Sequence, residues 1–124
     1  MDNNQYPVVH FEIGCPNTEE ASAFYQKTFN WDFTKAQHSS HIDTQSTEGI
    51  QGHMTTLGHE PHNYINIYIA VDDIEATLTA IEANGGQKHI GPLPLPDGKQ
   101  FAWFKDVAGN MLALVTKHPV SPAP

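Results

Sequence analysis

The sequence predicts an α+β fold built from two tandem βαβββ modules, and three observations support this. Apolar and polar residues alternate in two segments, 8–14 and 64–71, as expected for strands with one apolar face. Each segment is followed by a capped amphipathic helix and then by shorter strand-like segments. The two halves also line up at a nearly constant spacing. We therefore expect two four-stranded sheets, each with a helix on one face and with the other face free to curve around something.

The first module begins with the strand Val8–Gly14. Asn17 is predicted to cap the following helix, Thr18–Phe29, with Glu20 as its capping-box partner. Helical spacing assigns Phe24, Tyr25 and Phe29 to the core. Trp31, at the start of the next predicted strand, is assigned to the core as well. Three further strands and a polar linker complete the module: Trp31–Lys35, His41–Gln45, Gln51–Thr56 and then Gly58–Asn63.

The second module begins with the strand Tyr64–Val71. Asp72 is predicted to cap the next helix, with Glu75 as its box partner, and Asn84-Gly85-Gly86 ends that helix. The remaining strands are expected at Gln87–Ile90, Lys99–Lys105 and Met111–Lys117. A proline-containing loop, Gly91–Gly98, separates the first two of them, and the turn Asp106–Asn110 joins the last two.

The spacing between the two halves differs slightly along the chain. The strands align at an offset of 56 residues, as Phe11 does with Ile67, whereas the predicted caps Asn17 and Asp72 align at 55. We place the one-residue difference in the loop between strand and helix. Residues 1–124 are thus expected to form a single domain. Its modules span about 7–57 and 63–117, and 118–124 form a frayed tail.

Composition excludes several classes of function. The net charge is −8, and all six basic residues are lysines, which argues against binding to nucleic acid or to an anionic membrane. The single Cys15 excludes an internal disulfide and a cysteine-rich zinc site. The sequence contains no membrane-length apolar run and no signal-peptide pattern at Met1–Tyr6, so we expect a soluble cytoplasmic protein.

Four segments carry a resemblance to a known family: Val8-Val9-His10-Phe11-Glu12-Ile13, Glu20-Ala21-Ser22-Ala23-Phe24-Tyr25, Val71-Asp72-Asp73-Ile74-Glu75-Ala76, and Phe101-Ala102-Trp103-Phe104-Lys105-Asp106 with Gly109-Asn110. With these segments the chain resembles the vicinal oxygen chelate superfamily, particularly its small bacterial members. This superfamily includes glyoxalase I, bleomycin-resistance proteins and extradiol dioxygenases. The resemblance spans Pro7–Lys117. It implies a VOC domain in which curved mixed sheets, each with one helix on the outside, form a cup-shaped small-molecule site. It also implies a homodimer.

The resemblance also identifies the positions that hold metal ligands in metal-dependent members of the superfamily. They are His10, His53, Asn66 and Ala113. Histidine ligates divalent metals well, but an asparagine amide is a poor ligand for zinc or iron, and alanine offers none. We therefore expect no complete metal site and no cofactor. An alternative site of His10, Glu12 and His53 could hold Zn, Mn, Ni or Fe, because Glu12 shares a strand face with His10.

The candidate site residues follow from these assignments. His10 and Glu12 are proposed to be catalytic, with His10 as a donor or base and Glu12 orienting it or sharing its proton. The proposed ligand-binding residues are His53, Asn66, Tyr68, Trp103 and Ala113. Tyr68 and Trp103 either stack on a planar ligand or fill the space between the modules. The other histidines are assigned to solvated positions: His38, His41, His59, His62, His89 and His118.

Three functions remain open at this point. The favoured one is a protein that binds a small, neutral or aromatic molecule without a complete metal site, either sequestering it or acting on it by acid–base chemistry. The second is a metal-dependent lyase, isomerase or dioxygenase that uses His10, Glu12 and His53. The third is a structural or regulatory subunit without catalytic activity. The sequence therefore does not decide whether the protein is an enzyme, nor which ligand it binds.

Overall fold

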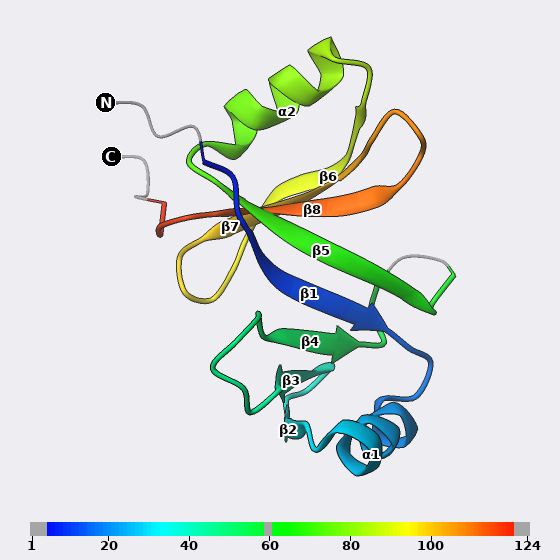
Figure 1. The fold of residues 1–124 in the computed structure, drawn as a ribbon. Coiled ribbons are helices and arrows are strands. Elements are labelled where there is room, and N and C mark those ends of the chain that lie inside the picture. The colour runs from blue at the N-terminus through cyan, green and yellow to red at the C-terminus, as the bar shows by residue number, and fades with distance from the viewer. Residues whose placement is uncertain (1–4, 59–60, 121–124) are drawn as a thin grey trace. The chain divides into compact units, whose positions relative to one another are not determined.

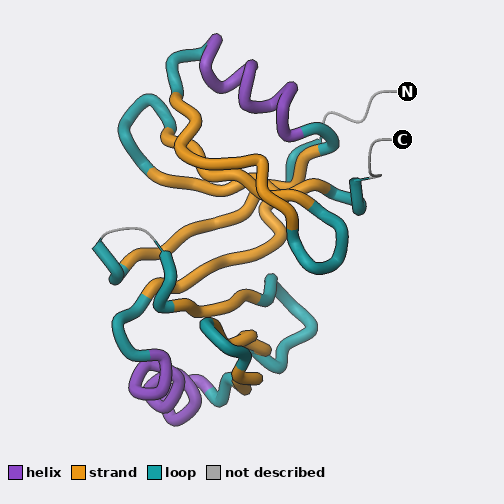
Figure 2. The backbone as a smooth tube through the Cα atoms, turned by 180° about the vertical axis from the view of Figure 1, so that it is seen from behind, coloured by secondary structure: helices purple, strands orange, loops and turns teal. Residues whose placement is uncertain are grey.

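The computed structural model describes residues 5–58 and 61–120 (Figure 1). The chain divides into two compact units. One unit comprises Val9–Ile67, and the other comprises Tyr68–Pro124 together with Met1–Val8. Each unit contains one helix and a group of strands, as the colouring in Figure 2 shows. The predicted α+β fold with two successive βαβββ modules is confirmed.

The first module contains the elements β1 (Val8–Gly14), α1 (Thr18–Phe29), β2 (Asp32–Lys35), β3 (Ser39–Asp43) and β4 (Gly52–Thr55). Its strands lie in the order β2-β3-β4-β1. β1 and β4 are parallel, whereas the pairs β2/β3 and β3/β4 are antiparallel. This mixed arrangement matches the sheet that the sequence predicts. The predicted bounds of β1 and α1 are also correct.

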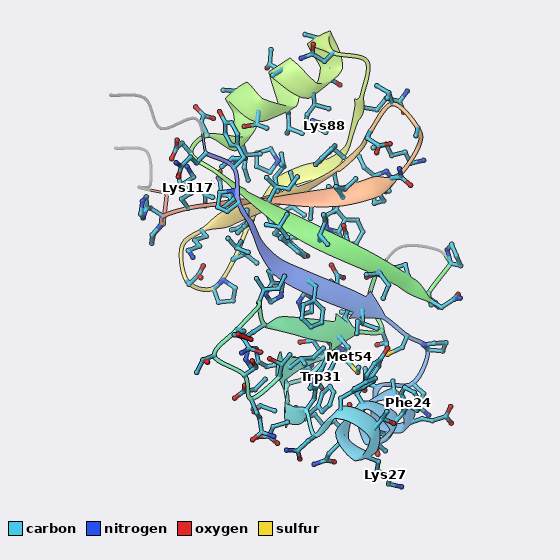
Figure 3. The ribbon with its side chains drawn as sticks, viewed as in Figure 1. Phe24, Lys27, Trp31, Met54, Lys88 and Lys117 are labelled. Carbon is cyan, nitrogen blue, oxygen red and sulfur yellow. The ribbon has the colours of Figure 1, made fainter. Side chains whose placement is uncertain are left out.

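The core of this module lies between the sheet and α1. Ile13, Ile42 and Met54 are buried there, and Tyr25 and Trp31 pack against them with their rings stacked 5.1 Å apart. Figure 3 labels Trp31 and Met54 in this region. The residues that alternate with this apolar set along the strands lie on the opposite face of the sheet.

Two aromatic residues of α1 are not in the core, contrary to the sequence prediction. Phe24, labelled in Figure 3, is 58 % exposed, and Phe29 is 56 % exposed. Tyr25 alone of the three packs against the buried cluster. Helical spacing placed all three rings on one stripe, but a short helix over a narrow sheet buries only the centre of such a stripe.

The second module contains the elements β5 (Tyr64–Val71), α2 (Ile74–Ala83), β6 (Gln87–Pro94), β7 (Gln100–Lys105) and β8 (Met111–Thr116). Its strands lie in the order β5-β8-β7-β6, with β5 and β8 parallel. Ile74 and Leu78 of α2 pack against Ala102, Phe104 and Leu114 of the sheet. The helix therefore covers one face of this sheet, as predicted.

The predicted cap of α2 is wrong by one residue. Asp73, not Asp72, is the N-cap, because its side chain accepts a hydrogen bond from the Ala76 amide at 3.1 Å. In α1 the Asn17 side chain accepts in the same way from Glu20, also at 3.1 Å. Asp73 lies 56 residues after Asn17, so the first strand and the helix of each module share one offset. The extra loop residue inferred from the sequence does not exist.

β6 is longer than predicted. It continues through Pro94 instead of ending at Ile90, although Gly91–Gly98 was assigned to a loop. Irregular register around Ile90 and Leu93 lets the strand pass its prolines while it still pairs with β7. The remaining strand ends agree with the predictions or differ from them by one or two residues. Of the predicted frayed tail, 121–124 lie outside the described residues.

Candidate functional site

Two histidines on neighbouring strands are in direct contact. His10 lies on β1 and His53 on β4, and their side chains share the sheet face opposite α1. His10 Nε2 lies 2.6 Å from His53 Nδ1, and the rings are stacked with their centroids 4.9 Å apart. One of these two nitrogens donates the hydrogen bond and the other accepts it. A single proton is therefore shared along this contact.

A buried carboxylate lies beside the pair. Glu12 is only 2 % exposed and pairs in register with His53 between β1 and β4. Its Oε2 atom is 3.9 Å from His53 Nε2 and accepts a hydrogen bond from the Tyr64 hydroxyl. The buried carboxyl group of Glu12 therefore lies next to His53 and is hydrogen-bonded to Tyr64.

Two glycines leave the space that the Tyr64 side chain occupies. A Cβ atom on Gly14 would lie 2.1 Å from the Tyr64 ring, and a Cβ atom on Gly58 would lie 1.7 Å from its hydroxyl oxygen. Only glycine leaves room for the ring at both positions. Tyr64 is not among the site residues predicted from the sequence. Its position on the same strand face as Asn66 was the available signal.

Burial keeps the two histidines neutral. The pKa of His10 falls from 6.5 to about 4, mainly because burial disfavours its charged form and also because His53 lies so close. The pKa of His53 also falls to about 4, through burial and then through His41. At pH 7 each ring therefore carries one N–H group and one basic nitrogen.

A third histidine shares this face. His41 on β3 pairs with His53 on β4, and Thr34 on β2 pairs with His41. Thr34, His41, His53 and Glu12 therefore form a row across the four strands, which we call the polar row. His41 was predicted to be a solvated residue. It is exposed, but the register places it in the row, and it contributes to the lowered pKa of His53.

The second module carries an apolar row at the corresponding positions. Tyr68 on β5 pairs with Ala113 on β8, Ala113 with Trp103 on β7, and Trp103 with Ile90 on β6. Tyr68, Trp103 and Ala113 are buried together as one cluster, with Ile90 packed against it. The structure therefore brings together three of the four predicted ligand-binding residues of this module.

Asn66 is the remaining predicted site residue. It lies on β5, two residues after Tyr64 and thus on the same strand face, and it is only 1 % exposed. Within the described residues, neither its side-chain nitrogen nor its side-chain oxygen has a hydrogen-bond partner. A buried amide in this state is costly, by roughly 1–3 kcal/mol for each unsatisfied group.

A model of one protein family matches residues 8–114 of the chain. Its description is Glyoxalase/Bleomycin resistance protein/Dioxygenase superfamily. The chain belongs to this superfamily. The match covers both modules and all the candidate residues, from His10 to Ala113.

Known proteins similar to this superfamily member include one relative in sequence and several in fold. A glyoxylase-like domain-containing protein of Didymella fabae is 30 % identical over 115 residues, which cover 86 % of this chain and 90 % of the relative. The hypothetical protein BH1468 of Bacillus halodurans C-125 has a TM-score of 0.71 at 16 % identity, covering 97 % of this chain and all of that one. A methylmalonyl-CoA epimerase of Mycobacterium tuberculosis has a TM-score of 0.63 at 14 % identity, with coverages of 94 % and 88 %.

The metal positions that the superfamily resemblance implies do not form a complete ligand set in this chain. His10 and His53 converge, but Ala113 has no ligating atom and Asn66 offers only an amide. Within residues 5–58 and 61–120, no three side chains of the types His, Cys, Asp and Glu are grouped so that they could hold a metal ion. The alternative set of His10, Glu12 and His53 does not meet this condition either.

Two clefts of the protein lie away from the candidate site residues. A groove of about 480 Å³ runs along α2 and is lined mainly by apolar residues, including Ala80, Ile81 and Phe104. A cleft of about 250 Å³ lies between α1 and the strands β2 and β3. Neither is lined by a candidate site residue.

Among the described residues, no helix is long and apolar enough to span a membrane.

Proposed function

We propose that this protein binds a small, neutral, partly aromatic molecule at the polar row and exchanges a proton with it without using a metal ion. The observation that carries the proposal is the 2.6 Å contact between His10 and His53, two imidazoles that burial holds neutral. A neutral imidazole pair acts as donor and acceptor at once, which suits acid–base work on an uncharged ligand.

The geometry suggests how such a proton would move. His10 takes a proton from the bound molecule while the proton on its Nε2 passes to His53 Nδ1, 2.6 Å away. The positive charge then lies on His53, whose Nε2 is 3.9 Å from the Glu12 carboxylate. Attraction between the two stabilises the charged intermediate. Return of the proton along the same path restores the neutral pair.

The charges near the site favour a neutral ligand. The chain has no arginine, and within 9–67 its lysines are Lys27 on α1 and Lys35 on β2. Lys35 pairs with Ser40 and so alternates with Thr34, which places it on the opposite sheet face from the polar row. Glu12 adds a negative charge to the row. A phosphate or a multiply charged acid would therefore meet repulsion without a balancing cation.

The proposal that the ligand is partly aromatic rests on residue type. Tyr68 and Trp103 are the large planar side chains among the predicted ligand-binding residues, and both are buried in the apolar row, at 9 % and 8 % exposed. They are assigned no part in catalysis. They carry no group that the proton path needs.

The test combines metal and ligand titrations on protein purified without an affinity tag. We expect no stoichiometric binding of Zn²⁺, Mn²⁺ or Ni²⁺ in calorimetry. In NMR titrations with a panel of neutral aromatic fragments, we expect binding that His10→Ala and His53→Ala abolish. His118→Ala, at an exposed position, is the matched control and should bind as the wild type does.

Two results would contradict the proposal. Micromolar, stoichiometric metal binding that disappears in His10→Ala would favour the metal-dependent lyase, isomerase or dioxygenase. Binding of methylmalonyl-CoA in preference to every neutral fragment would show that the site accepts an anionic thioester. If neither metal nor any fragment binds, the non-catalytic subunit becomes the better description.

Two further properties are proposed from the superfamily resemblance and the sequence. The protein is expected to be a cytoplasmic homodimer. Sedimentation equilibrium of the purified chain measures its mass directly. A monomer at micromolar concentration would contradict the dimer.

A further inference from the structure

Asn66 has the features of a residue that recognises a ligand. No group among the described residues forms a hydrogen bond with its side-chain amide. Its side chain is 1 % exposed, and its amide nitrogen and oxygen both lack hydrogen-bond partners among the described residues. Most buried polar side chains in folded proteins are hydrogen-bonded, because an unpaired group loses its bonds to water without replacement. Two unpaired atoms on one side chain therefore point to a partner that binds from outside.

The position of Asn66 connects it to the proposed site. It follows Tyr64 by two residues on β5, so both side chains leave the strand on the same face. The Tyr64 hydroxyl donates to Glu12, which is next to His53 in register. The unpaired amide thus faces the side of the strand on which the buried polar groups of the proposed site lie.

The chemistry of the amide specifies the ligand. A primary amide presents one acceptor oxygen and one donor nitrogen side by side in a plane. Its best complement is a molecule with a donor and an acceptor spaced in the same way, as when asparagine pairs with the edge of adenine. A carboxylate would satisfy only the nitrogen and would leave the oxygen unpaired. It would also add a second negative charge to a site that already holds Glu12.

We infer that Asn66 makes a two-point hydrogen bond to a planar lactam, imide or amide group, and that this edge defines the substrate class of the site. The inference rests on the proposed function, which supplies the neutral, partly aromatic ligand. It adds the group by which that ligand is held. The histidine pair then meets a molecule whose orientation Asn66 has fixed.

The test uses two probes and two variants. 2-Pyridone is a flat, neutral lactam, and N-methyl-2-pyridone has the same ring without the N–H donor. Asn66→Leu replaces the amide with an apolar group of similar shape. Asn63→Leu makes the same change at an exposed position as the matched control. Binding is measured by NMR titration, and the melting temperature of each free protein is recorded.

We expect the wild type to bind 2-pyridone at least about tenfold more tightly than its N-methyl analogue, as loss of a paired hydrogen bond implies. Asn66→Leu should remove this preference, and Asn63→Leu should keep it. The free Asn66→Leu protein should also melt higher, by about 3 °C, because an unsatisfied buried amide has been replaced by an apolar group. A residue with a structural hydrogen-bonding role would give the opposite shift.

Different results would overturn this inference and the proposed function. Equal binding of both probes that still depends on His10 would refute the role of Asn66 and leave the proposed function intact. A lower melting temperature for Asn66→Leu would show that the amide is already satisfied in the free protein, and would refute the inference by itself. If neither probe binds, the lactam assignment is wrong, and the fragment panel then decides the proposed function separately.

Discussion

Mild acid should destabilise this protein through its buried histidine pair. His10 and His53 have a pKa of about 4 in the folded chain, whereas 6.5 is the ordinary value expected when the chain unfolds. Between these values the unfolded state binds protons that the folded state does not. The free energy of unfolding therefore falls as the pH drops below 6.5, and this loss ends near pH 4.

The size of the effect follows from the two shifts. At pH 5 the gap below 6.5 is 1.5 pH units, and each unit corresponds to about 1.4 kcal/mol, so each histidine contributes about 2 kcal/mol. The His53 side chain is 27 % exposed, and solvent screens part of this effect. Reducing the sum by half leaves a loss of about 2 kcal/mol for the pair between pH 7 and pH 5.

Urea denaturation at pH 7.0, 6.0 and 5.0, followed by circular dichroism, measures this loss directly. The double variant His10→Gln/His53→Gln should lose less than about 0.5 kcal/mol over the same range, because it lacks the titrating rings. His118→Gln should behave like the wild type, since His118 is exposed. If the wild type is equally stable at all three pH values, the pair is not held neutral by burial, and the reasoning fails.

Three further predictions concern the fold. Asp73→Ala should cost about 1 kcal/mol through loss of the helix cap, and Asp72→Ala less than about 0.5 kcal/mol; equal costs in urea denaturation would contradict the cap assignment. Gly14→Ala should destabilise by about 2 kcal/mol, because its Cβ would overlap the ring of Tyr64. An unshifted NMR signal of that tyrosine would argue against the overlap. Leu114→Ala should cost roughly 2–5 kcal/mol in thermal unfolding, and a smaller loss would mean that the core around it collapses to fill the space.

The sequence was most informative where one physical signal dominated. Alternation over seven or eight residues defined both β1 and β5 correctly. It failed at the cap of α2, where Asp72 and Asp73 are chemically identical and only the backbone decides which one caps. It failed again at β6, where prolines suggested a loop but irregular register let the strand continue.

The candidate site was predicted in part for a similar reason. His10 and His53 could be assigned from the family resemblance, and their contact then follows from two adjacent strands. His41 could not, because its relation to His53 depends on the register of a hairpin whose strand was predicted two residues too late. Pairing between strands is long-range information, and local pattern does not contain it.

The two rows occupy matching register positions in the two modules. Thr34, His41, His53 and Glu12 correspond in register to Ile90, Trp103, Ala113 and Tyr68. The row carries His41, His53 and Glu12 in the first module and packed hydrophobic residues in the second. Under the function proposed above, substitutions that alter the proton affinity of the histidine pair and substitutions that alter the apolar row fall in separate stretches of the sequence.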